Sequence, residues 1–181
     1  MRLFLALELP ERAGDRFFES VELVRSSAAR GSFTRRENIH LTLAFLGEQP
    51  EERVPAVREI MDGCGLAPIT LTLGPLVRFR SREGNTLVRT AEKDPALMSL
   101  QSRLSDGLRA GGFELEARSY LPHLTVGRKV VLRPGVTLEG LNREITPLTA
   151  RIGRMTLFLS HRIGGALTYT PLHTRYLPFE E

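Results

Sequence analysis

Two short segments of this chain of 181 residues share one pattern, and the pattern constrains the local structure of each. Residues 39–43 read Ile-His-Leu-Thr-Leu, and residues 122–126 read Pro-His-Leu-Thr-Val. Residues i and i+2 of a β-strand point to the same face of a sheet. A histidine and a threonine therefore share one face of each predicted strand, and the leucine and valine neighbours point into a core. The two segments predict two strands of matching polarity in the two halves of the chain.

Apolar periodicity and the Gly and Pro residues divide the rest of the chain into short elements. Strands are predicted over residues 1–9, 38–46, 69–73, 76–80, 86–90, 113–117, 121–126, 154–160 and 166–169. Helices are predicted over residues 11–30, 50–61 and 95–109. Gly31 is a plausible stop for the first helix, and Asp94 is a plausible N-cap for the third. The pairs Gly-Asn at 84–85 and Gly-Gly at 164–165 predict hairpins, whereas residues 135–148 give no clear prediction.

The order of these elements predicts an α+β fold. Strands joined by hairpins favour antiparallel or mixed sheets, with the helices outside them. No Gly/Ser-rich or low-complexity linker divides the chain, and its length suits one domain. The repeated motif suggests an internal duplication. We therefore expect a single bilobed domain over residues 1–181, with one motif in each lobe, at 40–43 and at 123–126.

Composition and charge narrow the class of protein. The formal net charge is +4, and the basic residues are almost all arginine, with Lys93 and Lys129 the only lysines. The planar guanidinium suits phosphate, so this excess is compatible with nucleic acid, although an arginine-biased genome would produce the same composition. The single cysteine, Cys64, excludes an internal disulfide. No apolar run reaches the length of a membrane span, and Glu8 and Glu11 argue against a signal peptide, so a cytoplasmic protein is expected.

The paired histidines admit more than one interpretation. A histidine on a strand can be a structural core residue, but two copies with threonine in the same place argue against this for both. Two histidines are also an incomplete zinc set; a third ligand is needed, and Glu37 and Glu48 flank the first motif only at a distance. The sequence has no Gly-x-Ser-x-Gly elbow, no Walker loop and no Gly-x-Gly-x-x-Gly after a strand.

Phosphoryl transfer without a metal or other cofactor fits this pattern best. A neutral imidazole can take a proton from an attacking water, and an imidazolium can give a proton to a departing ribose oxygen. In-line displacement places attacker and leaving group on opposite sides of phosphorus, so the two histidines should face each other across a cleft. The hydroxyls of Thr42 and Thr125 can donate hydrogen bonds to the non-bridging oxygens. The near-symmetry of the motifs leaves open which histidine is the acid.

Longer segments around the motifs resemble a known family. Residues 2–10 read Arg-Leu-Phe-Leu-Ala-Leu-Glu-Leu-Pro, residues 37–48 read Glu-Asn-Ile-His-Leu-Thr-Leu-Ala-Phe-Leu-Gly-Glu, and residues 122–128 read Pro-His-Leu-Thr-Val-Gly-Arg. They resemble the bacterial and archaeal RNA 2′,3′-cyclic phosphodiesterases, or 2′-5′ RNA ligases of the LigT and ThpR type, in the two-histidine phosphoesterase superfamily. The likeness extends over essentially the whole chain. It implies a bilobed α+β fold with a pseudo-two-fold axis through a β-lined cleft.

The resemblance also implies an activity and roles for five residues. It implies hydrolysis of a 2′,3′-cyclic phosphate at an RNA end to a 2′-phosphate, with His40 as proton donor, His123 as proton acceptor, and Thr42 and Thr125 as substrate-binding residues. It implies a phosphate-binding role for Arg128, although strict alternation sends this side chain away from the cleft unless the neighbouring glycine hosts a bulge. Ligation, the reverse reaction, and a nucleotide-binding module without turnover are the alternatives.

The substrate and the remaining aromatic and histidine residues complete these expectations. RNA ends or small cyclic nucleotides are the expected partners of a monomer that needs no membrane and no protein partner. Members of the family often carry a tryptophan shortly before the first motif, but this chain has none. Phe33 lies in that stretch and is expected to belong to the core or to a lid. His161 and His173 have no threonine two residues later and are expected to be structural or surface residues.

Overall fold

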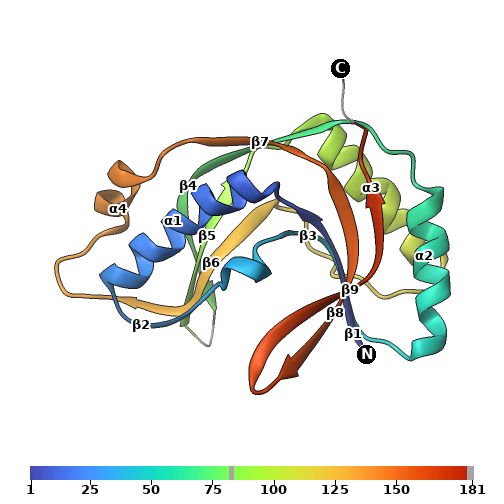
Figure 1. Ribbon diagram of the computed structural model, residues 1–181, viewed down its shortest axis with the longest axis horizontal. Helices are drawn as coiled ribbons and strands as arrows, with labels where there is room; N and C mark the ends of the chain where they lie inside the picture. The colour runs from blue at the N-terminus through green and yellow to red at the C-terminus, as the bar shows by residue number, and fades with distance from the viewer. Residues whose placement is uncertain (82–83, 179–181) are drawn as a thin grey trace.

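The computed structural model describes residues 1–81 and 84–178, which form two antiparallel sheets with helices outside them (Figure 1). The predicted α+β class is therefore confirmed. The strands are β1 (Arg2–Glu8), β2 (Ala28–Phe33), β3 (Leu41–Glu48), β4 (Ile69–Ser81), β5 (Gly84–Ala91), β6 (His123–Leu132), β7 (Leu148–Ile152), β8 (Arg154–Ile163) and β9 (Ala166–Tyr176). The helices are α1 (Glu11–Ser27), α2 (Val54–Gly63), α3 (Pro95–Ala110) and α4 (Leu138–Glu144), with short 3₁₀ helices at Arg36–Asn38 and Glu51–Arg53.

The strand order interleaves distant parts of the chain. The four-stranded sheet has the order β3-β1-β8-β9, and the five-stranded sheet has the order β2-β6-β5-β4-β7. The chain therefore crosses from one sheet to the other after β1, β2, β3 and β7. At the last crossing, Gly153 is the residue between β7 and β8. Neither sheet is built from a contiguous half of the chain, because β1 pairs with β8 and β2 pairs with β6.

One apolar core joins both sheets and the helices that cover them. Helix α1 lies over the five-stranded sheet, and α2 and α3 lie together beside the four-stranded sheet (Figure 1). In α1, Phe17, Val21 and Val24 are fully buried on one stripe, as its helical spacing predicts. Strand β1 is buried on both faces: its odd-numbered leucines enter the common core, whereas Phe4 belongs to a smaller apolar cluster with Phe158 on the opposite face.

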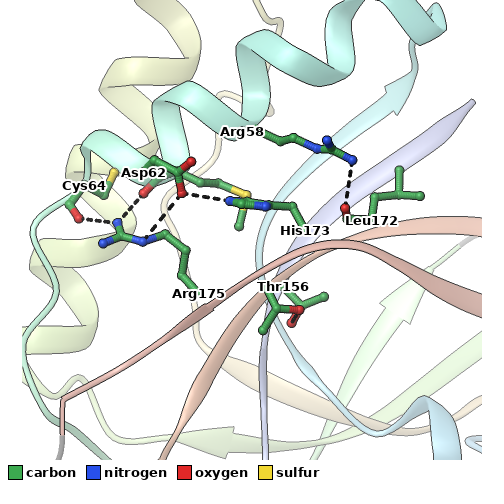
Figure 2. A network of polar contacts seen from close by, with 9 residues as sticks. Arg58, Asp62, Cys64, Thr156, Leu172, His173 and Arg175 are labelled. Atoms are coloured by element: carbon green, nitrogen blue, oxygen red, sulfur yellow. Dashed lines mark hydrogen bonds and ion pairs between the residues drawn. The ribbon is translucent and has the colours of Figure 1, made fainter.

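Helix α2 is fixed to β9 by a group of polar contacts on the outside of the fold (Figure 2). His173 Nε2 lies 2.8 Å from a carboxylate oxygen of Asp62. The Arg175 guanidinium donates hydrogen bonds to the backbone carbonyls of Met61 and Cys64, near the end of the helix. The Met61 carbonyl also accepts a hydrogen bond from the backbone N–H of Cys64, so the arginine is a second donor to this helix end. His173 has a structural position, as the sequence predicts.

The first helix is shorter than predicted. It ends at Ser27, and Arg30 and Gly31 lie within β2, so the expected helix to residue 30 and its stop at glycine are wrong. The cause is tertiary pairing: β2 lies antiparallel to β6, which the local sequence cannot indicate.

Three other differences concern segments without strong periodicity. Residues 113–117 are irregular instead of a strand; there, Phe113 is buried beneath the guanidinium of Arg53, and this side-chain contact replaces a backbone ladder. Helix α4 and strand β7 lie in or next to the segment that gave no clear prediction. The hairpin predicted at Gly84-Asn85 places these residues in a turn, but both already belong to β5; residues 82–83, which precede them, lie outside the described residues. None of the helices in residues 1–81 and 84–178 is long and apolar enough to cross a membrane.

Candidate active site

The two His-x-Thr segments lie on different sheets and keep the alternation that the sequence predicts. His40 lies one residue before β3, in the four-stranded sheet, and His123 begins β6, in the five-stranded sheet. Leu41 and Leu124, which follow the two histidines, are both fully buried. The histidines and their threonines are half-buried. Each motif therefore presents its polar side chains on the surface of its sheet and its apolar side chains to the core.

All five residues singled out in the sequence line one cavity. His40 and Thr42 from one sheet, and His123, Thr125 and Arg128 from the other, surround a space of about 840 Å³. The cavity is basic: its described lining contains five arginines and one glutamate, namely Arg2, Arg35, Arg118, Arg128, Arg162 and Glu116. Such a lining suits an anionic ligand.

A backbone carbonyl fixes the tautomer of each histidine. Nδ1 of His40 lies 2.7 Å from the carbonyl oxygen of Asn38, and Nδ1 of His123 lies 2.7 Å from that of Leu121. A carbonyl oxygen only accepts, so Nδ1 carries the proton in both rings. Nε2 is then the atom available for proton transfer, and in His40 it lies 3.1 Å from Oγ1 of Thr42. In both motifs, the hydrogen bond from Nδ1 to the carbonyl two residues earlier leaves Nε2 available for proton transfer.

Aromatic rings enclose the first histidine. The ring of Phe4 lies 4.9 Å from the His40 ring, and the ring of Tyr169 meets it edge-on at 5.2 Å. The pKa of His40 is lowered from 6.5 to about 4, with burial as the largest cause; the hydrogen bond to Asn38 opposes this shift, whereas the charge of Arg128 and the electrostatic effect of His123 add to it. His40 is therefore neutral at pH 7 in the free protein.

The second histidine has a less enclosed setting with the same direction of shift. Phe79 meets the His123 ring edge-on, with ring centroids 5.1 Å apart. Burial lowers the pKa of His123, as do the charges of Arg128 and Arg118, and the hydrogen bond to Leu121 raises it. Both imidazoles are thus neutral near pH 7 in the free protein.

A bulge in β6 brings Arg128 to the same side as the second motif. Leu87 of β5 pairs with Gly127, but the next residue, Val88, pairs with Thr125, so Val126 is an extra residue in the ladder. An extra residue reverses the alternation beyond it. The prediction that a bulge near Gly127 re-aims this arginine is therefore confirmed. Arg128 lines the same cavity as His40 and His123, and its charge lowers the pKa of both histidines.

A tyrosine that the sequence analysis did not select links the two sheets at the motifs. The hydroxyl of Tyr120 donates a 2.9 Å hydrogen bond to the backbone carbonyl of Thr42. Burial of this hydroxyl raises the pKa of Tyr120. On the other motif, Oγ1 of Thr34 donates a 2.7 Å hydrogen bond to the carbonyl of Thr125. Neither residue belongs to a recognisable motif, so only the three-dimensional contact identifies them.

The remaining sequence expectations have mixed outcomes. His161 lines the cavity, and its Nε2 lies 2.7 Å from Oγ1 of Thr170 on the neighbouring strand. The sequence offers His161 no threonine two residues later, but Thr170 partners it from across the β8–β9 hairpin, which spacing along one strand cannot show. Phe33 packs against the core and also lines the cavity. Among the described residues, no group of three or more His, Cys, Asp or Glu side chains could hold a metal ion.

Comparisons with known proteins agree with this geometry. A sequence profile of the 2′-5′ RNA ligase superfamily matches residues 10–163. A protein of Thermus thermophilus named RNA 2′,3′-cyclic phosphodiesterase is 32% identical over 152 residues, which are 75% of this chain and 72% of the relative. A protein of Escherichia coli with the same name is 29% identical over 175 residues, or 94% and 93% of the two chains.

The fold has a solved counterpart with a nucleotide bound. The crystal structure of E. coli LigT complexed with 3′-AMP superposes with a TM-score of 0.79 and 26% sequence identity, and the match covers 97% of each chain. The likeness therefore includes both sheets and both motifs of the described chain.

Proposed function

Because the chain belongs to the 2′-5′ RNA ligase superfamily, we propose that it hydrolyses the terminal 2′,3′-cyclic phosphate of RNA to a 2′-phosphate. The observation that carries this proposal is the matched pair of imidazoles, each held by a carbonyl so that Nε2 is available in one basic cavity. The relatives named RNA 2′,3′-cyclic phosphodiesterase and the 3′-AMP bound by LigT support an RNA end as substrate.

The reaction needs one proton acceptor and one proton donor. In the proposed mechanism, Nε2 of His123 removes a proton from a water molecule as the water oxygen attacks phosphorus. The bond between phosphorus and the ribose 3′-oxygen breaks, and Nε2–H of His40 gives that oxygen its proton. The product carries a 2′-phosphate, and the two histidines have exchanged protonation states. Each proton transfer contributes about 10²–10⁴-fold to the rate.

The substrate's own charge supplies the protonated histidine. His40 is neutral in the free protein, so it needs a proton before it can act as a donor. A cyclic phosphate is an anion, and an anion next to an imidazole raises its pKa. Binding therefore favours the protonated form of one histidine at the moment when a donor is needed.

The neighbouring side chains suit the charge that develops on phosphorus. The hydroxyls of Thr42 and Thr125 can donate hydrogen bonds to the two non-bridging oxygens, one from each sheet. The guanidinium of Arg128 adds a fixed positive charge beside both imidazoles. The apolar core that runs through both sheets supports the further proposal of one bilobed domain with one motif in each lobe.

The test is turnover of an RNA oligonucleotide that ends in a 2′,3′-cyclic phosphate, with the product isomer identified by nuclear magnetic resonance of phosphorus. The expected product is the 2′-phosphate. His40→Ala and His123→Ala should each lower kcat by at least about 100-fold. His173→Gln is the matched control, since His173 lies on the outer side of the fold, and its kcat should equal that of the wild type.

Other outcomes separate the alternatives. A 3′-phosphate product would contradict the proposed direction of cleavage. Tight binding of the oligonucleotide without any product would favour a binding module. Loss of activity in a chelator, restored by zinc, would favour the metal interpretation. Joining of RNA ends at high concentration would add the reverse reaction, which uses the same two histidines.

A further inference from the structure

A second cavity opens directly beside the active site. It has a volume of about 740 Å³ and lies between α3, the β4–β5 hairpin and the segment that precedes β6. It shares Thr42, His123 and Arg128 with the active-site cavity, so the two spaces meet at the residues proposed to hold the cyclic phosphate. The proposed function gives this second cavity no role.

The lining that belongs to the second cavity alone is cationic and rich in hydrogen-bond donors. Arg80 on β4 and Arg109 on α3 both face this space, and neither lines the active-site cavity. Ser102 on α3 adds a hydroxyl, whereas the side-chain amide of Gln101 already donates to the Leu43 carbonyl and to the Ser105 hydroxyl. This combination of guanidinium groups and a hydroxyl suits a phosphodiester and the sugar or base beside it.

An aromatic ring marks the boundary between the two cavities. Phe79 lines the second cavity and meets the ring of His123 edge-on, at 76° and with centroids 5.1 Å apart. Tyr120 lines the same cavity while its hydroxyl is bonded to the backbone of Thr42. Aromatic side chains in a basic groove are the usual platform for bases of single-stranded nucleic acid. The second cavity therefore has the two components that a nucleotide needs.

We propose that the second cavity binds the nucleotide that precedes the cyclic-phosphate end in an RNA strand. This inference rests on the proposed function, which places a cyclic phosphate at His40 and His123. The rest of such a strand continues from the 5′-oxygen of the terminal ribose, and each linkage carries one negative charge. Arg80 and Arg109 lie where that charge can be neutralised. The preferred substrate is then an RNA strand of at least two nucleotides, not a cyclic mononucleotide.

The test compares kcat/KM for a cyclic mononucleotide with that for a dinucleotide and a tetranucleotide ending in the same cyclic phosphate. The kcat/KM of the wild type should be at least about tenfold higher for the dinucleotide than for the mononucleotide. It should also fall more steeply with salt concentration for the dinucleotide. In the double variant Arg80→Gln/Arg109→Gln this preference should fall towards one, while kcat/KM for the mononucleotide stays unchanged. Arg143→Gln is the matched control, because Arg143 is exposed on α4 and lines neither cavity.

Binding measurements separate this inference from the proposed function. Fluorescence anisotropy with labelled 2′-phosphate products of one and two nucleotides measures the length dependence without turnover. Length-dependent affinity that the double variant removes would support the second cavity as a nucleotide site even if no substrate were hydrolysed. Equal kcat/KM and equal affinity for one and two nucleotides in the wild type would overturn the inference. So would a double variant that weakens both lengths equally.

Discussion

Arg128 and the substrate act on the two active-site histidines in opposite directions. The positive charge of Arg128 lowers the pKa of His40 and His123 and adds to the larger effect of burial. A bound phosphate anion raises both pKa values. The empty site therefore holds neutral imidazoles, and the occupied site can hold one imidazolium. In the proposed mechanism, the arginine that attracts the substrate also keeps the free histidines ready to accept protons.

This opposition predicts two different pH profiles. The profile of kcat/KM reports the free enzyme, so it should fall as pH rises from a maximum below pH 6.5, because the donor then loses its proton. The profile of kcat reports the complex and should be displaced to higher pH. In Arg128→Gln, loss of the positive charge raises the pKa of both histidines, so the falling limb of kcat/KM should move to higher pH. Initial rates from pH 4 to pH 9 test this.

The matched control for this prediction is again Arg143→Gln, whose profile should coincide with that of the wild type. If the falling limb of the kcat/KM profile does not move in Arg128→Gln, the charge of Arg128 does not influence the two histidines. The maximum of kcat/KM should also be lower in the variant, because it lacks the guanidinium that is proposed to bind phosphate.

At the residue scale, the sequence predicted the residues that carry a repeated pattern. His40, Thr42, His123 and Thr125 fall in one cavity because strand alternation is a local rule that each motif obeys. Tyr120 was not predicted, because its role depends on the position of a strand 78 residues away in sequence. A residue whose role depends on a contact with a distant part of the chain has no recognisable local sequence pattern.

At the element scale, the bulge in β6 depends on a tightly packed glycine. A Cβ on Gly127 would lie 2.9 Å from the ring of Phe33 and 3.0 Å from a methyl group of Val130. Gly31 in the paired strand β2 is in similar contact with the same ring. Phe33 therefore packs across two glycines and closes the edge of the sheet at the bulge. Glycine is required at these two positions because a Cβ atom would occupy the space of the Phe33 ring, which lies directly on the backbone.

Gly127→Ala should therefore displace Phe33 and disturb the bulge that aims Arg128. We expect a loss of about 1–3 kcal/mol in the free energy of unfolding, together with a lower kcat/KM. Urea denaturation and initial rates measure the two effects. Gly14→Ala is the matched control: no atom lies within 4 Å of the added Cβ, and alanine in a helix interior should stabilise α1 by about 0.5–1 kcal/mol. Unchanged stability in Gly127→Ala would contradict the close packing.

The elements that the sequence predicted well are those with strong local signals. Helix α3 begins at Pro95 and has Asp94 as its N-cap, with the side chain accepting from the backbone N–H of Leu97. The β8–β9 hairpin turns at Gly164 and Gly165, which both have positive φ. Strand β2 was missed because its residues before Phe33 are alanine, arginine, glycine and serine, which give no strand signal; it forms a strand because it pairs with β6.

At the scale of the whole molecule, a buried arginine joins three parts of the chain. Arg89 on β5 is 1% exposed. Its guanidinium donates hydrogen bonds to the carbonyls of Leu73 and Gly74 on β4, to that of Thr146 before β7, and to the hydroxyl of Ser20 on α1. The β4–β5 register is irregular at these carbonyls, and the arginine satisfies them. This contact explains why β4 continues through the Gly-Pro pair that separates two predicted strands.

Arg89→Met should destabilise the whole fold, because it removes the donor from four buried or partly buried acceptors. Each unsatisfied buried group costs about 1–3 kcal/mol, so a total loss of about 3–5 kcal/mol is expected in urea denaturation. Arg89→Lys should recover only part of this loss, since one ammonium cannot reach four acceptors. Arg143→Met, at an exposed position, should change the free energy of unfolding by less than about 0.5 kcal/mol. An unaltered midpoint for Arg89→Met would show that the contact contributes nothing.

The single residue between β7 and β8 limits how the two sheets can move. Gly153 connects the edge strand of one sheet to an inner strand of the other, and its carbonyl accepts a hydrogen bond from the backbone N–H of Leu177. Because this connection is only one residue long, it restricts how far the two sheets can move apart at this end. The spacing of the two imidazoles is consequently a product of folding, already in place when an RNA end arrives. We therefore expect the active site to be a preformed template, with little relative motion of the two sheets between turnovers.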